Sequence, residues 1–182
     1  MNENILDLLE GFVPEITEDD SIDFSQPIKC GALVVIKEGG RNRGEKKDSG
    51  EKYDFLYLKM QIAEVIDGEE KSIGRFINKN YALIDKIWKD GKVGKAVDNV
   101  KKLLRDLHTM GYDFNVPQTI EEEDFYEALT VHLGGLVDKT AYMRCYHFAD
   151  KDDPEKRVQV KNIVNELKKR SEVKKDNSNV PF

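Results

Sequence analysis

The alternation of hydrophobic and polar residues along the chain predicts five β-strands. The first predicted strand, Ile28–Gly39, is apolar and rich in β-branched residues, and the second, Tyr53–Val65, alternates residue by residue. Such patterns are typical of strands. An Asp67-Gly68 turn leads into the third strand, and two more strands follow near the end of the chain. These last three strands are predicted at Ser72–Asn80, Asp138–Ala149 and Arg157–Val164.

Between the third and fourth predicted strands, the hydrophobic period changes to that of an α-helix. A helix is predicted to begin at Tyr81–Trp88, to be interrupted by KDGKVG, and to resume until Gly111, a suitable C-terminal cap. The resumed part has an apolar stripe, which consists of Val97, Val100, Leu104 and Leu107. The capping-box spacing of Thr119 and Glu122 predicts a further helix that ends at Gly134-Gly135. The apolar residues of this helix are Phe125, Leu129 and Leu133.

The predicted order of elements is β-β-β, helices, β-β. That is the order of the OB-fold, a five-stranded, partly open Greek-key barrel that binds oligonucleotides on one face and its loops. We therefore expect a mainly β protein, with an OB-like domain over residues 28–164 and a helical insertion at about 81–135. Another small β-barrel, or an α+β sandwich with helices on one face, fits the same order.

The two ends of the chain differ from this domain in charge and periodicity. Residues 1–27 hold eight acidic residues and no basic one, which leaves +2 on residues 28–182 out of a net charge of −6. We expect an acidic N-terminal arm, begun by a short amphipathic turn that contains Ile5, Leu8, Leu9 and Phe12. Residues 165–182 lose all periodicity, so a flexible tail is predicted there.

Several function classes lack support in the sequence. No apolar stretch approaches the ~18–20 residues that span a bilayer, and the acidic start does not resemble a signal peptide, so we expect a cytoplasmic protein without a membrane partner. Cys30 and Cys145 form no CxxC pair and are expected to be small buried residues in strands. No metal-ligand spacing, phosphate loop or catalytic motif is present, so neither an enzyme nor a cofactor is predicted.

Two predicted strands divide into an aliphatic row and an aromatic, cationic row, because successive strand residues point to opposite faces. In the second strand, Leu56, Leu58, Met60 and Ile62 form the aliphatic row. The other rows are Tyr53, Phe55, Tyr57 and Lys59 in the second strand, and Tyr142, Arg144 and Tyr146 in the fourth. Rings interleaved with cations suit single-stranded nucleic acid, because unpaired bases stack on rings at ~1–3 kcal/mol each. The alternative is that these residues have high β-propensity and pack beneath the helices.

A Gly-rich, charged segment, Gly39–Lys52, is predicted to be a loop between the first two strands. Its basic residues could close over a bound strand, with Arg75 of the third strand nearby. These candidates are Arg41, Arg43, Lys46 and Lys47. The alternative interpretation is an ordinary solvated loop, because acidic and basic residues are nearly balanced in it.

Two segments of the domain resemble bacteriophage OB-fold single-stranded DNA-binding proteins. LGGLVDKTAYMRCYHFADKDDPEKRVQVKNI is similar to the ending of those proteins, and KYDFLYLKMQIAEVIDGEEKSIGRF to their central hairpin. The resemblance covers roughly residues 28–164. It implies a non-enzymatic protein that binds single-stranded DNA in replication or recombination, in the bacterial host cytoplasm if the protein is viral.

The last residues, Val180, Pro181 and Phe182, resemble the tip of bacterial single-stranded DNA-binding proteins. In those proteins the terminal Pro-Phe follows acidic residues and docks on replication and repair partners. Here Asp176 is the only nearby acidic residue, which is a departure from the pattern. The resemblance implies that the tip binds such partners.

Two other functions remain open. The first is a phage-type interaction module that binds a host protein, with the acidic arm mimicking nucleic acid. The second is an enzyme or enzyme subunit, for which the carboxylates of Glu121–Asp124 are the candidates, although acidic residues are also favoured in the first turn of a helix. The sequence leaves open DNA against RNA, the site size and the oligomeric state, a homo-oligomer included.

Overall fold

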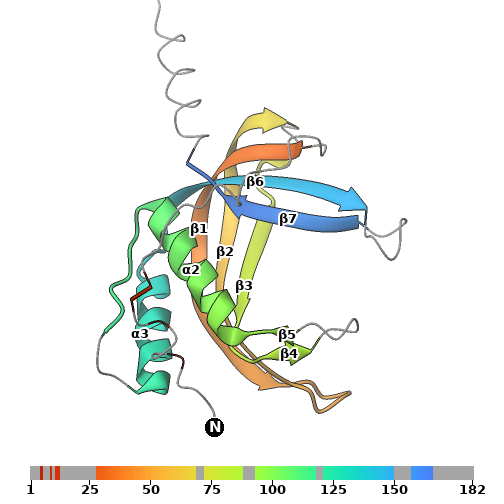
Figure 1. Ribbon diagram of the computed structural model, residues 1–182. Helices are drawn as coiled ribbons and strands as arrows, with labels where there is room; N and C mark the ends of the chain where they lie inside the picture. Colours follow the sequence, from red (N-terminus) through yellow and green to blue (C-terminus); the bar gives the residue numbers. More distant parts are fainter. Residues whose placement is uncertain are drawn as a thin grey trace, which may run out of the picture.

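The computed structural model describes residues 5, 9, 11–12, 28–68, 72–87, 93–117, 121–149 and 157–165. Almost half of these residues form a curved antiparallel sheet (Figure 1). The order of strands in the sheet is β3-β2-β1-β6-β7. The strands are β1 (Ile28–Glu45), β2 (Lys52–Gly68), β3 (Phe76–Ala82), β6 (Thr140–Ala149) and β7 (Arg157–Ile163). A mainly β protein with five principal strands is therefore confirmed.

The sheet does not close into a barrel. Strands β3 and β7 are its two edges, and no backbone ladder joins them in the described part of the chain. A side chain spans the two edges instead, because Lys161 Nζ on β7 donates a hydrogen bond to the carbonyl oxygen of Asn78 on β3, at 2.9 Å. The five-stranded barrel expected from the order of elements is therefore not observed in the described residues.

Strand β1 is longer than its sequence predicted, and this corrects the loop expected at Gly39–Lys52. The strand continues to Glu45, and only residues 46–51 connect it to β2. The glycines are explained by close neighbours rather than by a loop. A β-carbon on Gly39 would lie 2.4 Å from the carbonyl oxygen of Leu133, so a larger residue would push away the backbone of a helix. Glycine at this position therefore permits close packing within a strand.

The helix expected to begin at Tyr81–Trp88 is not formed. Tyr81 belongs to β3, where buried residues alternate with exposed ones, and residues Lys86–Ile87 form the short strand β4. Strand β4 pairs with β5 (Val93–Gly94). Tyr81 is 1% exposed, and its hydroxyl donates a hydrogen bond to Asp106 Oδ2 at 2.6 Å. The apolar residues in this segment thus follow the period of a strand that packs against a helix.

Two helices lie where the second half of the insertion was predicted. They are α2 (Ala96–Met110) and α3 (Glu122–Gly134). Gly111 caps α2 in the left-handed conformation, with φ of 80°, as expected. The N-cap of α3 is Glu121 rather than Thr119, which lies outside the described residues. The predicted apolar residues of both helices are buried.

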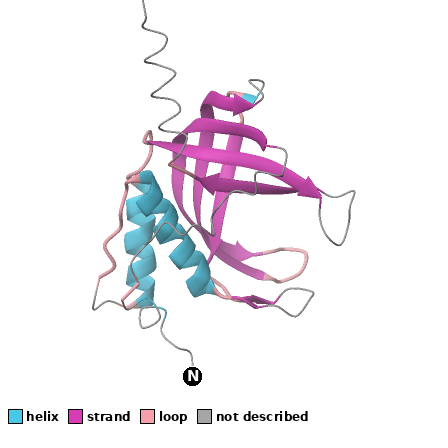
Figure 2. Ribbon diagram, turned by 45° about the horizontal axis from the view of Figure 1, so that its top comes forward, coloured by secondary structure: helices cyan, strands magenta, loops and turns pink. Residues whose placement is uncertain are grey.

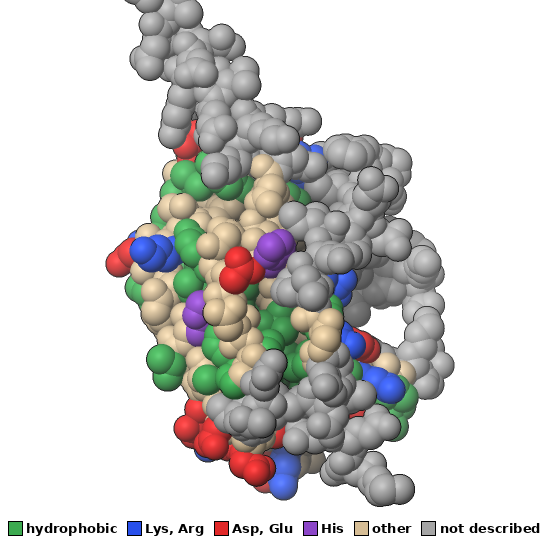
Figure 3. Space-filling model, turned by 60° about the vertical axis from the view of Figure 1, so that its left-hand side comes forward, with side chains coloured by type: hydrophobic (Ala, Val, Ile, Leu, Met, Phe, Trp, Pro, Cys, Tyr) green, Lys and Arg blue, Asp and Glu red, His purple; other side chains and the backbone are tan. Residues whose placement is uncertain are grey.

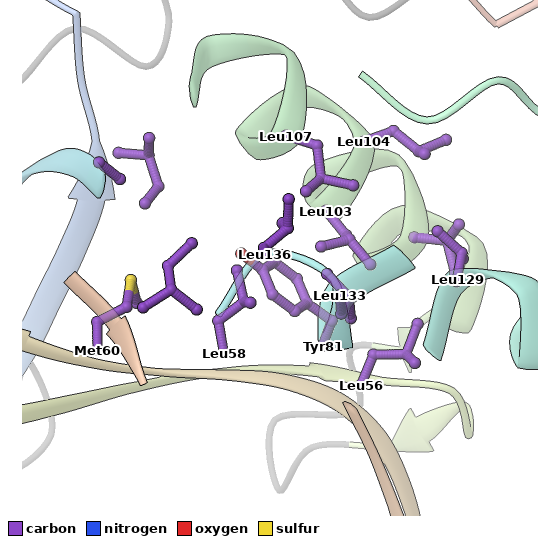
Figure 4. Close-up of a cluster of buried hydrophobic side chains, with 14 of the residues drawn as sticks. Leu56, Leu58, Met60, Tyr81, Leu103, Leu104, Leu107, Leu129, Leu133 and Leu136 are labelled. Carbon is purple, nitrogen blue, oxygen red and sulfur yellow. The ribbon is translucent and has the colours of Figure 1, made fainter. Parts of the chain in front are cut away.

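Both helices pack on the same side of the sheet (Figure 2). The aliphatic row of β2 points toward them, and Leu56, Leu58 and Met60 belong to the same buried cluster as the leucines of α2 and α3 (Figure 4). Ile5 and Leu9, from the predicted acidic arm, are buried in the same core. The side of the sheet opposite to this core is consequently the side that the two helices leave uncovered.

Candidate nucleic-acid interface

Strand β2 has the two different faces that its sequence predicts. Its aliphatic residues are fully buried, whereas Tyr53, Phe55 and Tyr57 are half-buried on the side away from the helices. The ring centroids of Tyr53 and Phe55 are 6.0 Å apart, and those of Phe55 and Tyr57 are 6.4 Å apart. Three rings therefore form a continuous row along one strand.

Two tyrosines of this row lie next to glycines of β1. Tyr57 is paired with Gly40, and Tyr53 is paired with Gly44. A β-carbon on Gly40 would lie 3.6 Å from ring atoms of Tyr57, and one on Gly44 would lie 2.7 Å from the hydroxyl oxygen of Tyr53. Both rings thus rest against the β1 backbone, an arrangement in which aromatic residues cover glycines of a neighbouring strand.

Strand β3 adds a fourth ring, which the sequence analysis did not identify. Phe76 is 55% exposed, and Lys59 Nζ lies 5.1 Å from its ring centroid. Asn78 and Asn80 are exposed on the same side, where they pair with Lys59 and Tyr57. The signal was present in FINKNYA, because Phe76 alternates with residues that are buried. We call this surface the aromatic face; it comprises Tyr53, Phe55, Tyr57, Lys59, Phe76, Asn78 and Asn80.

Arg41 and Arg43 lie on the side of the sheet opposite to the aromatic face. Side chains alternate along β1, and Gly40 and Gly44, which pair with the two tyrosines, hold the positions on the aromatic side. Arg41 donates to both carboxylate oxygens of Asp54, at 2.8 and 2.6 Å, and to Glu123 Oε1 at 2.8 Å. Its guanidinium also lies 5.1 Å from the ring centroid of Tyr126. The hydrogen bond with Asp54 is the main reason that the pKa of Arg41 lies above the usual value for arginine. This side chain, only 10% exposed, fastens α3 to the sheet.

The remaining predicted cations are mostly paired with carboxylates. Arg43 contacts Glu123 at 2.7 Å, Lys46 contacts Glu51 at 2.6 Å, and Lys59 lies 3.8 Å from Glu38. Lys47 and Arg75 are exposed, and the described residues offer neither of them a salt bridge. The ionic contacts reduce the number of cations available for phosphates.

Glu38 also accepts a hydrogen bond from the Tyr57 hydroxyl, at 2.5 Å. That hydrogen bond raises the pKa of Tyr57, because deprotonation would place two negative charges side by side. Tyr57 therefore stays neutral, and the hydroxyl end of its ring is held next to β1.

The aromatic row expected on β6 is only partly available. Tyr142 is half-buried, but Tyr146 is 8% exposed and Arg144 is 1% exposed. Arg144 is paired with Gly31 in the middle of the sheet, since β6 lies between β1 and β7. Neither Tyr146 nor Arg144 can contact a base in this arrangement, so the candidate interface is confined to β2 and β3.

The helical side of the molecule is acidic at one end. Figure 3 shows acidic side chains gathered at the lower end of that side, where the first turn of α3 lies in Figure 1. This turn contributes Glu122, Glu123 and Asp124. Glu123 accepts hydrogen bonds from Arg41 and Arg43, and Glu122 Oε1 accepts one from the Tyr126 hydroxyl at 2.9 Å. These carboxylates stabilise the position of the helix, and they would repel phosphates on that side.

The described residues contain no group of three or more histidine, cysteine or acidic side chains that could hold a metal ion. Within the same residues, no helix combines the length and apolar character needed to cross a membrane. Val180, Pro181 and Phe182, which form the predicted partner-binding tip, lie outside the described part of the chain. Comparisons with protein-family models, curated proteins and solved structures find no match for this chain.

Proposed function

We propose that the protein is a non-enzymatic, single-stranded DNA-binding protein that acts in phage DNA replication or recombination. The observation that carries this proposal is the row of Tyr53, Phe55 and Tyr57, which lies on the side of the sheet that α2 and α3 leave uncovered. Half-exposed rings in a row offer stacking surfaces for bases, and single-strand-binding proteins use such platforms.

We also interpret the sheet as an OB-type sheet in which the two edge strands, β3 and β7, are not paired with each other over the described residues. Helices are inserted between the third and fourth long strands, as in that fold, and its five principal strands are antiparallel neighbours in the order β3-β2-β1-β6-β7. The contact between Lys161 and Asn78 supports this interpretation, because it joins the two strands that a closed barrel would pair.

The spacing of the rings favours an extended single strand over a duplex. Centroids 6.0 and 6.4 Å apart are nearly twice the ~3.4 Å between stacked bases of one DNA strand. Successive bases can each stack on a ring only if they separate from one another, and pairing in a duplex prevents that. Asn78 and Asn80 can both donate and accept hydrogen bonds, so they can contact the edges of any base.

The proposed binding depends more on stacking than on phosphate contacts. Arg41 and Arg43 are paired with acidic residues on the other side of the sheet, and Lys46 is paired with Glu51. The candidates for phosphates are therefore Lys47, Arg75 and Lys59, whose contact with Glu38 is the longest of these ion pairs, at 3.8 Å. Neutralising Z phosphates of a single strand gives a salt slope of roughly −0.7Z. A small number of contacts therefore predicts a shallow slope.

A direct test is fluorescence anisotropy with labelled oligo-dT and the full-length protein at low salt. The proposal predicts binding to the single strand and much weaker binding to a duplex of equal length. An oligo-rU titration, run in parallel, establishes whether RNA is also bound. No anisotropy change with oligo-dT, from protein that circular dichroism reports as folded, contradicts the proposal.

A protein-interaction module, binding a host protein, is the second candidate. It is favoured by the exposed apolar pair on the β4–β5 hairpin, where Ile87 is 74% exposed and its partner Val93 is 53% exposed. Isolation of one specific protein from nuclease-treated host extract, together with an absence of oligonucleotide binding, selects this function. Loss of that capture in an Ile87→Ser variant places the contact on the hairpin.

A further inference from the structure

The two cysteines, remote in sequence, are directly opposite each other in the sheet. Cys30 on β1 is paired with Cys145 on β6, and both are free thiols that are 3% exposed. Directly opposed residues of an antiparallel ladder have α-carbons about 4.5–5.5 Å apart. Disulfides usually join α-carbons about 4.4–6.8 Å apart, so the backbone already has the separation that a disulfide requires.

The surroundings make the two thiols unequal. A hydrogen bond from Cys145 is the main reason that the pKa of Cys30 falls, to about 7, and Ser72 and Arg75 lower it further against the effects of burial and Asp67. The same hydrogen bond and burial raise the pKa of Cys145, despite the nearby charges of Lys161 and Lys79. Cys30 thus loses its proton first, and Cys145 keeps its proton next to the resulting thiolate.

We propose that Cys30 and Cys145 are a dithiol that hydrogen peroxide closes to a disulfide between β1 and β6. Because both thiols are buried, peroxide reaches them when this part of the sheet opens locally. The Cys30 thiolate attacks one oxygen of hydrogen peroxide, the O–O bond breaks, and the hydroxide released takes up a proton to form water. Cys145 sulfur then attacks the sulfenic sulfur of Cys30, its proton and the leaving hydroxide form a second water, and the S–S bond forms. Two sulfurs are oxidised, and the two peroxide oxygens are reduced.

The position of the pair gives the disulfide a structural effect. The ladder between β1 and β6 is the junction between the β3-β2-β1 part of the sheet and the β6-β7 hairpin. A bond from Cys30 to Cys145 encloses both helices and most of the described strands, and long enclosed loops restrict the unfolded chain most strongly. The oxidised protein therefore unfolds at a higher temperature than the reduced one.

The test uses the full-length, reduced protein and a stoichiometric amount of hydrogen peroxide. After the reaction, the protein is denatured, alkylated with N-ethylmaleimide and weighed intact under non-reducing conditions. The expected product is a monomer that has lost two hydrogens and takes up no maleimide, and dithiothreitol restores both thiols. Two alkylated thiols after exposure, or a disulfide-linked dimer, overturn the proposal.

Serine variants assign the two roles. Cys145→Ser leaves a Cys30 sulfenic acid that dimedone labels, whereas Cys30→Ser leaves Cys145 with a markedly slower reaction toward peroxide. Equal reaction rates for the two folded variants contradict the assigned roles. The measurement on the unmodified protein remains decisive if either variant fails to fold, and it does not depend on whether the protein binds DNA.

Discussion

Replacement of Arg41 by alanine should weaken the attachment of α3 to the sheet and leave the candidate nucleic-acid interface in place. The change removes two hydrogen bonds to Asp54, the ion pair with Glu123 and the stacking on Tyr126. Removing one partner of a fully buried ion pair costs about 3–5 kcal/mol. Asp54 is 19% exposed and Glu123 is 52% exposed, so water compensates part of that loss. We expect a decrease of roughly 2–3 kcal/mol in the free energy of unfolding.

Urea denaturation, followed by circular dichroism, measures this decrease as a lower midpoint with an unchanged slope. Arg43→Ala is the matched control, because Arg43 lies on the same side of β1 and contacts the same Glu123 but is 65% exposed. Its loss should cost about 0–1 kcal/mol. An Arg41→Ala protein with full stability and reduced oligonucleotide binding would refute the structural role and restore Arg41 as a phosphate ligand.

Three further outcomes follow from the same geometry. Gly39→Ala should destabilise the fold by about 1–3 kcal/mol, because the new β-carbon would lie 2.4 Å from a helix carbonyl oxygen. Gly40→Ala should be almost neutral, because the nearest atom to its β-carbon is 3.6 Å away. Thermal unfolding of both variants measures the difference. The hydrogen bond from Arg41 lowers the pKa of Glu123 below its ordinary value. This pair therefore stabilises the fold fully above the ordinary glutamate pKa, and the contribution disappears as pH falls through the lowered pKa. Acid titration of a Glu123→Gln protein should show a smaller pH dependence of stability. For the proposed DNA binding, the slope of log Kobs against log salt should lie near −1.4 to −2.1, as expected for roughly two or three phosphate contacts, and a slope of about −4 or steeper contradicts the dominance of stacking.

The alternation along the chain was sufficient to predict the five principal strands and the two faces of β2. In β2, every second residue is buried from Leu56 to Ile62, because one side meets the helices and the other does not. The same rule explains why α2 and α3 could be located from their apolar residues. Local patterns therefore succeed where an element has one buried side.

The glycines of β1 led to the incorrect prediction of a loop between the first two strands. Gly39, Gly40 and Gly44 suggested a loop, but two of them allow tyrosine rings to rest on β1 and the third allows α3 to approach. Those neighbours are distant in sequence, so no local pattern could reveal them. Consequently Arg41 and Arg43 belong to a strand, whose alternation places them away from the aromatic face.

The candidate site was only half predictable for a similar reason. The row on β2 was identified from alternation alone, but the equivalent row on β6 is largely buried, because burial there depends on the whole sheet. Phe76 could have been found by applying the same alternation to β3. The pairing of the two cysteines required the order of strands, which one sequence does not contain.

The most direct test of the proposed function is the affinity of a Tyr57→Ala protein for oligo-dT, measured by fluorescence anisotropy. Loss of one stacking ring, at ~1–3 kcal/mol, predicts an affinity about 5- to 150-fold lower than that of the unchanged protein. Tyr57→Phe, which keeps the ring and loses only the hydrogen bond to Glu38, should bind nearly normally. Val131→Ala, at a site 76% exposed on α3, controls for surface changes. Equal affinities for Tyr57→Ala and Val131→Ala proteins, both folded, would contradict the claim that single strands bind on the aromatic face.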